Sequence, residues 1–335
     1  MTNANSPLSE SPLSESPLSE RPLGEKPANG GHGVATLHVP EEIMQRESET
    51  MTTIVWKRFR RHPAAIISTI VLGILILSVI LISLSPYDPE VSDMASRLQP
   101  PTLQHPMGTD QLGRDMLTRV LYGGRISIIV AFMVVIITLL VGMPIGAAAG
   151  YFGGPVDNIL MRITDVALTL PTLLVLILLS AIMREVELPI FKRNSVMTIA
   201  LVIGLLSWMT AARLLRAEFL RIRELEFIEA AHATGASNIR VMIRHIFPNA
   251  ISPIIVQSTL MLGYAIMIES GLSFLGFGIQ PPTPSWGNLL SNAQQHMTRH
   301  PWLAIFPGLM IFLTVISINY IGDALRDAFD PYKVL

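Results

Sequence analysis

The most informative residue spacing in the chain lies in a polar, arginine-bearing stretch, residues 226–249, between two long apolar runs. Glu229-Ala230-Ala231 is followed by Gly235 four residues after Ala231, and Pro248 comes thirteen residues further on. These residues include an acidic side chain, a residue with free backbone rotation and a helix breaker, flanked by arginines. The chemistry that they predict is that of a charged contact surface.

The local pattern of this stretch predicts two short helices joined by a turn. The first helix is expected over residues 227–233, and the second over residues 238–247, ending at Pro248 just before the next apolar run. Gly235 permits the turn between them because a side chain at that position obstructs the left-handed backbone. Two short helices joined at one glycine form a rigid knob rather than a flexible tether.

Several kinds of chemistry are missing from the sequence. It contains no cysteine, which excludes disulfides, thiolate metal sites and cysteine nucleophiles, and its eight histidines are scattered. It has no G-x-x-x-x-G-K-[ST] loop to bind nucleotide phosphates. We therefore expect no catalytic residues, no bound metal and no cofactor on this chain, so that any driving energy comes from a partner.

Glu269 is the most notable isolated ionisable residue, because it stands at the far end of a long apolar run. A carboxylate at membrane depth usually faces an interior cavity and marks a functional path. The alternative is that Glu269 lies at the membrane interface, where it snorkels or pairs. The sequence leaves both interpretations open.

A second polar stretch, residues 108–115 (GTDQLGRD), comes before a periodic run over residues 111–121. A Thr-Asp step at such a place predicts a helix start with Asp110 near its positive end. Further along, residues 281–287 (PPTPSWG) predict a turn stiffened by proline, with Trp286 at the membrane–water interface.

The elements that position these residues are membrane helices. Half of the residues are hydrophobic and 15% are charged, whereas a soluble domain has about 25% charged residues. The mean hydropathy is +0.49. Charge-free runs long enough to cross about 30 Å of hydrocarbon as helices predict six spans: residues 64–86, 126–150, 166–183, 195–212, 250–272 and 301–321.

Two contacts between or within these helices are also predicted. Gly142, Gly146 and Gly150 recur every four residues, and such a flat helix face permits close packing of membrane helices. Arg162 and Asp165 stand three residues apart, which favours an ion pair on one helix face.

Basic residues near the span ends predict the orientation. Residues 57–61 hold four basic side chains before the first span, and six arginines lie between Arg213 and Arg244. The excess of positive charge places both termini and the loop 213–249 in the cytoplasm. An even number of spans requires the same.

Residues 1–49 have a different composition from the apolar remainder, residues 50–335. SPLSE occurs three times and a glycine- and proline-rich stretch follows. Such a sequence buries too little apolar surface to offset its ordering entropy, so a disordered cytoplasmic tail is expected, either without function or with a docking role. The net charge of −1 gives no indication of nucleic-acid binding.

Three motifs in order resemble those of a known family. The stretch at residues 226–249 resembles the EAA loop of bacterial ABC-importer permeases, and residues 108–115 and 281–287 narrow the likeness to the second permease subunit of dipeptide, oligopeptide and nickel importers. The likeness runs from about Trp56 to Pro331. It implies an all-α type I ABC-importer transmembrane domain in the bacterial inner membrane. The sequence departs from the family motif at Phe247, which stands where a leucine usually precedes the proline.

The resemblance also implies roles and partners. Glu229, Ala230, Ala231, Gly235 and Pro248 are implied to couple the chain to its ATPase subunits. Asp110, Arg114, Asp115 and Trp286 are possible contacts of an extracytoplasmic solute-binding protein. The remaining implied partners are a homologous permease forming a heterodimer and two ATPase subunits that carry ATP and Mg, all embedded in or apposed to membrane lipid.

The expected function is therefore that of the membrane-spanning subunit of an ATP-driven importer of di- or oligopeptides. Nickel complexes, glutathione or another peptide-like solute remain the alternative within this class. A secondary carrier or channel acting alone, and a membrane scaffold without transport, are the rivals from other classes. The exact substrate is not readable from the sequence.

Overall fold

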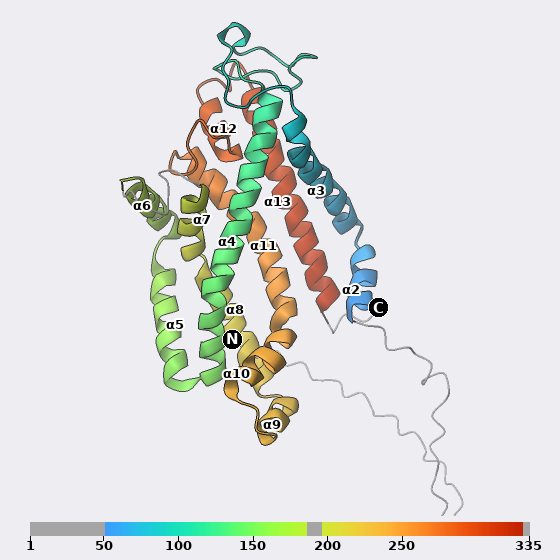
Figure 1. Cartoon of the computed structure of the whole chain (residues 1–335), viewed down its shortest axis with the longest axis vertical. Coiled ribbons are helices and arrows are strands. Elements are labelled where there is room, and N and C mark those ends of the chain that lie inside the picture. Colours follow the sequence, from blue (N-terminus) through green and yellow to red (C-terminus); the bar gives the residue numbers. More distant parts are fainter. Residues whose placement is uncertain (1–50, 186–195, 331–335) are drawn as a thin grey trace, which may run out of the picture. The chain divides into compact units, whose positions relative to one another are not determined.

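A computed structural model describes residues 51–185 and 196–330; the predicted tail, residues 1–49, lies outside them. The described residues belong to one compact unit, Glu49–Leu335, and contain helices but no β-strand (Figure 1). The helices are α2 (Met51–Arg60), α3 (Pro63–Leu81), η1 (Ile82–Leu84), η2 (Met94–Ser96), α4 (Met116–Phe152), α5 (Gly154–Thr169), α6 (Thr172–Glu185), α7 (Val196–Leu205), α8 (Trp208–Arg223), α9 (Glu226–Ala233), α10 (Asn238–Val241), η3 (Met242–Ile246), α11 (Phe247–Phe274), α12 (Trp286–Ala293) and α13 (Trp302–Phe329).

The apolar helices account for the predicted membrane crossings. Four stretches are long and apolar enough to cross by themselves: Pro63–Leu84, α4, Asn238–Phe274 and α13. Two further crossings arise if each bent pair of helices is one span: α5 with α6, which meet at 86°, and α7 with α8, which meet at 47°. The predicted all-α membrane fold is confirmed, and the described residues provide four crossings, or up to six if each bent pair counts as one span.

The two bends were not predicted, since residues 166–183 and 195–212 were each expected to be one uninterrupted span. The break between α5 and α6 falls at Pro171, which lacks an amide hydrogen and disfavours helix at the preceding residue. At the break before α8, the hydroxyl of Ser207 donates to the carbonyl oxygen of Ile203 at 2.8 Å. Such a bond competes with the helix ladder and bends helices.

The helix of the fifth span is longer than the sequence predicted, whereas the third and fourth spans are interrupted. The prediction that a helix ends at Pro248 is wrong, because a single helical stretch runs from Asn238 to Phe274. Pro248 lies in the first turn of α11, where its missing amide costs least. The preceding segment η3 is a π-helix, in which the amide of Phe247 reaches back to the carbonyl oxygen of Met242. This wider turn accommodates the proline without ending the helix.

The central helix is α4, which packs against α7, α8 and α11. Gly142, Gly146 and Gly150 form the predicted flat face and lie against α8; a Cβ atom at Gly146 would stand 2.3 Å from the carbonyl oxygen of Ala212. The prediction that these glycines serve helix packing is confirmed. Because lipid gives no hydrophobic drive between helices, such close packing is what holds them together.

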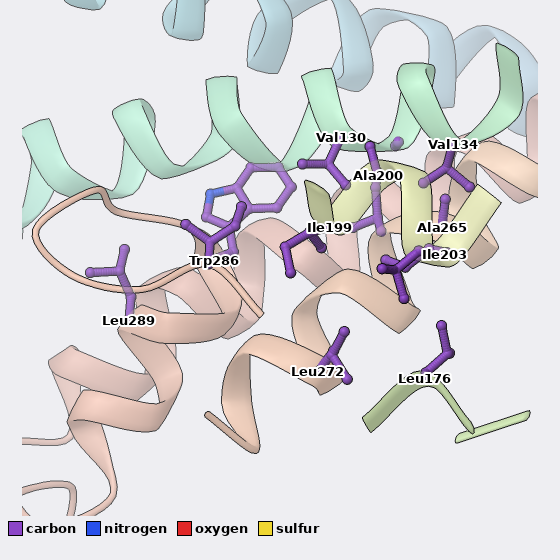
Figure 2. Packing of buried hydrophobic residues seen from close by; sticks show 14 of the residues in the cluster. Val130, Val134, Leu176, Ile199, Ala200, Ile203, Ala265, Leu272, Trp286 and Leu289 are labelled. Atoms are coloured by element: carbon purple, nitrogen blue, oxygen red, sulfur yellow. The ribbon is translucent and has the colours of Figure 1, made fainter. Parts of the chain in front are cut away.

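Around α4, buried side chains of α6, α7, α11 and α12 form the main core (Figure 2). Trp286 lies inside it with 1% of its surface exposed, and its ring nitrogen donates to the carbonyl oxygen of Val120 at 2.9 Å. The prediction that Trp286 lies at the membrane–water interface is therefore wrong. The tryptophan instead fastens the start of α12 to α4.

Ion pairs fasten α5 to α8. The predicted pair of Arg162 with Asp165 does not form, because Asp165 pairs with Arg213. Nearby, the guanidinium of Arg216 donates to both carboxylate oxygens of Asp157 at 2.5 and 2.6 Å. The acidic residues of α5 thus bind arginines of another helix rather than a neighbour on their own.

Candidate functional site

The predicted contact surface is a knob formed by α9, α10 and the turn between them, residues 226–241. It lies at one end of the long helices, whereas α12 and the loop of residues 85–115 lie at the opposite end (Figure 1). Helix α8 extends beyond its apolar part to Arg223 and leads directly into α9. The knob is therefore carried on a helix that is continuous with a membrane crossing.

Gly235 forms the turn of the knob as its position predicts. Its φ angle is +81°, in the region that favours glycine. Its amide donates to the carbonyl oxygen of His232 at 2.9 Å, and that of Ala236 donates to Ala231 at 3.1 Å. No atom stands within 4 Å of where a Cβ would be, so the requirement for glycine here is conformational and not steric.

One side of the knob is anchored to the body of the protein. Ile228, Ala231 and Val241 are buried and pack with α8 residues in a second core. The hydroxyl of Tyr151, on α4, donates to Oδ1 of Asn238 at 3.0 Å and stands 3.3 Å from Nε2 of His232. These contacts hold the knob rigidly against α4 and α8.

The other side of the knob faces outward. Glu229, Ala230 and Pro248 are exposed, whereas Ala231 of the same motif faces inward. Large apolar side chains are exposed on and beside the knob: Ile239 and Ile243 show 68% and 66% of their surface, and Phe227 shows 42%. Large exposed apolar side chains gathered on a surface are typical of a site that contacts another protein or the membrane.

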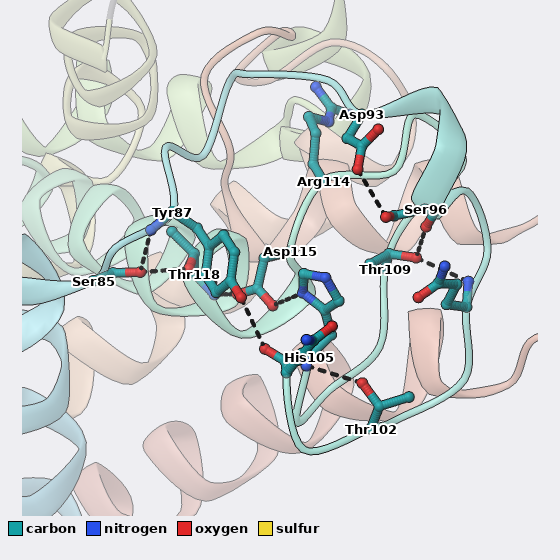
Figure 3. A network of polar contacts seen from close by, with 12 residues as sticks. Ser85, Tyr87, Asp93, Ser96, Thr102, His105, Thr109, Arg114, Asp115 and Thr118 are labelled. Atoms are coloured by element: carbon teal, nitrogen blue, oxygen red, sulfur yellow. Dashed lines mark hydrogen bonds and ion pairs between the residues drawn. The ribbon is translucent and has the colours of Figure 1, made fainter.

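The predicted residues of the 108–115 stretch lie in the loop at the opposite end of the molecule from the knob (Figure 1), and Figure 3 labels Arg114 and Asp115 within a polar network there. Asp110, Arg114 and Asp115 are all buried, and the guanidinium of Arg114 donates to Asp110 at 2.8 Å. The prediction that Asp110 caps a helix beginning at residue 111 is wrong. The cap is Asp115, which accepts the amide of Thr118 at 2.8 Å, and α4 begins at Met116. His105 binds the other side of the Asp115 carboxylate at 2.9 Å.

Sequence reasoning missed Arg119, which is completely buried. Its guanidinium donates to the carbonyl oxygen of Pro89 at 2.6 Å and lies 3.4 Å from the Asp110 carboxylate. A buried arginine needs such partners, because an uncompensated charge is costly to bury. The sequence signal was an arginine near the start of a long and mainly apolar helix, α4, which also carries Arg125.

Glu269 lies inside the protein rather than at either of the places expected for it. Its side chain has no exposed surface, so in this conformation it neither lines a water-filled cavity nor snorkels to the interface. Its carboxylate accepts hydrogen bonds from Ser127 on α4 at 2.9 Å and from Ser273 at 2.7 Å. Ser127 in turn accepts the amide of Trp286 at 3.4 Å, so Glu269 helps to join α4, α11 and α12.

Within residues 51–185 and 196–330, no group of three or more histidine, aspartate or glutamate side chains is placed to hold a metal ion. The described residues thus hold an outward-facing knob at one end and a buried polar network at the other, with two bent helix pairs between them.

Comparison with known families agrees with this geometry. Residues 142–333 match the family of the binding-protein-dependent transport system inner membrane component. The chain belongs to this family. Residues 50–101 also match the N-terminal transmembrane domain of oligopeptide transport permease C.

Individual relatives cover most of the chain. A dipeptide transport system permease protein, DppC, of Alkalihalophilus pseudofirmus is 39% identical over 82% of this chain and 88% of its own length. A glutathione transport system permease protein, GsiD, of Pectobacterium atrosepticum is 37% identical over 89% of this chain and 96% of its own.

A solved structure shares the fold. The inward-facing MetNI methionine ABC transporter superposes with a TM-score of 0.52 and 16% identity, covering 64% of this chain and 98% of that one. The chain is thus a multi-pass permease subunit of an ABC importer with the type I transmembrane fold, a family that works together with ATPase and partner permease components.

Proposed function

We propose that the chain is the membrane-spanning subunit of a bacterial inner-membrane importer of di- or oligopeptides. The observation that carries the proposal is the rigid knob, whose outward side presents Glu229 and exposed apolar residues at the end of α8. A partner that binds this surface moves α8 directly, because α9 follows that helix after a two-residue break. Glu229, Ala230, Ala231, Gly235 and Pro248 form the coupling element.

The proposed assembly contains this chain, a homologous permease, two ATPase subunits and an extracytoplasmic solute-binding protein. ATP and Mg bind to the ATPase subunits. When the two ATPase subunits close on each other, they move the knob, and the pore switches between its inward- and outward-facing states. The arginines of residues 213–244 support a cytoplasmic position of the knob. Both termini of the chain are then cytoplasmic as well.

The opposite end is proposed to face the binding protein. Asp110, Arg114, Asp115 and Trp286 are buried, so their proposed role is to hold this end in shape rather than to touch the partner. We assign the contact itself to exposed apolar side chains of the same loop, such as Val91, Met94 and Leu103. The buried polar network holds this loop in place.

The peptide substrate is supported by the names of the relatives, which include dipeptide and glutathione permeases. Another peptide-like solute or a nickel complex is the alternative. The test is uptake of a radiolabelled dipeptide into proteoliposomes that contain the whole complex. We expect uptake to require ATP inside and the binding protein outside. Uptake driven by a proton gradient without ATP would indicate a secondary carrier, and no uptake of any solute would indicate a scaffold.

A further inference from the structure

The two bent spans break at mid-length of α4 (Figure 1), at residues 170–171 and 206–207. Helix interruptions at membrane depth are tolerated only where the backbone is buried in protein or lines a water-filled cavity. Here the two breaks and α11 together line one pocket of about 420 Å³. Pro171 and Ser207 account for the breaks locally, and the pocket is the feature that residues beside both breaks line together.

The lining of this pocket, which we call the break pocket, has a distinct chemistry. Its polar members are Thr172, Ser207, Thr210, Gln257 and Tyr264, and its remaining members, among them Met261, are leucine and methionine. None of the lining side chains is a carboxylate, an ammonium or a guanidinium. Uncharged donors and acceptors match the peptide group, and methionine adapts to side chains of different shapes.

Gln257 connects the break pocket with a second one. It and Leu260 also line a pocket of about 400 Å³ that reaches Arg326 and Asp330 at the end of α13. That end of α13 lies on the same side as the knob (Figure 1). Gln257 and Leu260 thus belong to the lining of both pockets, which are neighbours along α11.

The side chain of Gln257 itself needs a partner. It stands on a 28-residue helix at membrane depth, is half-buried, and forms no hydrogen bond with any part of the chain that the structure describes. A side-chain amide at membrane depth is unfavourable unless water or a solute bonds it. Water or a solute that bonds both its oxygen and its nitrogen removes this cost, and a peptide group does both.

We propose that the break pocket is this subunit's share of the translocation path and that Gln257 binds the peptide groups of the passing solute. The proposal rests on the proposed function and deepens it: the path selects for amide groups without selecting for charge. Thr210 and Tyr264 supply further uncharged hydrogen-bonding groups on either side of Gln257.

The absence of cysteine from the chain makes a direct test possible. Gln257→Cys and Ile255→Cys are made singly in the complete complex with cysteine-free partners, and both are treated with a charged, membrane-impermeant thiol reagent on the knob side. Ile255 is 39% exposed on the same helix but lines neither pocket. We expect Gln257→Cys to be labelled and its uptake to be blocked, and Ile255→Cys to remain unlabelled. Equal labelling of both positions would overturn the proposal.

A second measurement tests binding rather than access. Gln257→Leu keeps the approximate volume but removes the amide, and we expect the KM for dipeptide uptake to rise about tenfold, the effect of one lost hydrogen bond. Thr259→Val is the matched control, since the hydroxyl of Thr259 bonds only its own helix, at Ile255. Unchanged KM in Gln257→Leu, with ATP-driven uptake intact in the wild type, refutes the peptide-binding role and leaves the proposed function standing. Absence of uptake in the wild type refutes the proposed function instead.

Discussion

The hydroxyl of Tyr151, in the last turn of α4, donates a 3.0 Å hydrogen bond to Oδ1 of Asn238, the first residue of α10. The two residues are 87 positions apart in the sequence. The bond ties the central helix of the protein to the knob, on the side away from Glu229. A force applied to the outer surface of the knob therefore reaches α4 as well as α8.

Replacing Tyr151 with phenylalanine removes this tie while keeping the ring. One hydrogen bond contributes about 1 kcal/mol, so we expect a few-fold fall in the amount of solute imported per ATP hydrolysed, with little change in membrane abundance. The measurement is uptake and ATPase activity in the same proteoliposomes. Tyr320→Phe, at an exposed position of α13, is the control. A normal ratio of uptake to hydrolysis in Tyr151→Phe would show that the bond carries no coupling.

The second prediction concerns Gly235. Its φ of +81° is unattainable for proline, whose ring holds φ near −65°, and proline also removes the amide that donates to His232. We expect Gly235→Pro to abolish uptake and the stimulation of ATPase activity by loaded binding protein while the permease still inserts. Because the site is open, Gly235→Ala costs only backbone strain of about 1–2 kcal/mol, and Gly235→Asn less. An order of activity other than Gly, Asn, Ala, Pro would mean that the turn is not what this position supplies.

The third prediction concerns charge on the outer side of the knob. Glu229 is exposed, so reversing its charge leaves the fold intact and changes only its electrostatic interaction with a bound partner. We expect Glu229→Lys to weaken the stimulated ATPase activity and uptake, more strongly at low salt, because ions screen exposed charges. Asp323→Lys makes the same change at an exposed position of α13 outside the knob and should be harmless. Equal effects of the two variants would place the ATPase contact elsewhere.

Local sequence patterns predicted the parts of the fold that depend on few neighbours. The apolar runs marked the helices, the four-residue spacing of Gly142, Gly146 and Gly150 marked a packing face, and Gly235 marked a turn. Each of these follows from the conformational freedom or the size of the residue itself. The amino-acid sequence alone therefore predicts the type of these elements and their order along the chain.

The rest depended on tertiary partners that a single sequence does not display. Arg162 stands three residues before Asp165 in the sequence, yet Asp165 forms its ion pair with Arg213 on α8. Tryptophan is a residue type common at membrane interfaces, but Trp286 lies in the core, where its ring nitrogen donates a hydrogen bond to the carbonyl oxygen of Val120. For Glu269 the sequence left a cavity and the membrane interface both open, because it does not display the hydrogen bond from Ser127, which is 142 residues away.

The hydrogen bonds from Ser127 and Ser273 to Glu269 give the fourth prediction, which separates a structural from a transport role of Glu269. Glu269→Ala leaves the hydroxyls of Ser127 and Ser273 without their acceptor, and each buried group so stranded costs about 1–3 kcal/mol. We expect a clear fall in the thermal midpoint of the detergent-solubilised complex. Glu269→Gln keeps one acceptor oxygen, so its midpoint should lie between those of the alanine variant and the wild type.

The transport assay completes this test, because a carboxylate that acts only in packing has no effect on solute movement by itself. Uptake by Glu269→Gln, normalised to the amount of folded permease, should match the wild type. Asp323→Ala, which removes an exposed carboxylate of α13 outside the knob, should alter neither the midpoint nor uptake. If Glu269→Gln keeps the wild-type midpoint but loses uptake, the carboxylate takes part in transport. Its burial in this conformation would then be one state of a group that moves during the cycle.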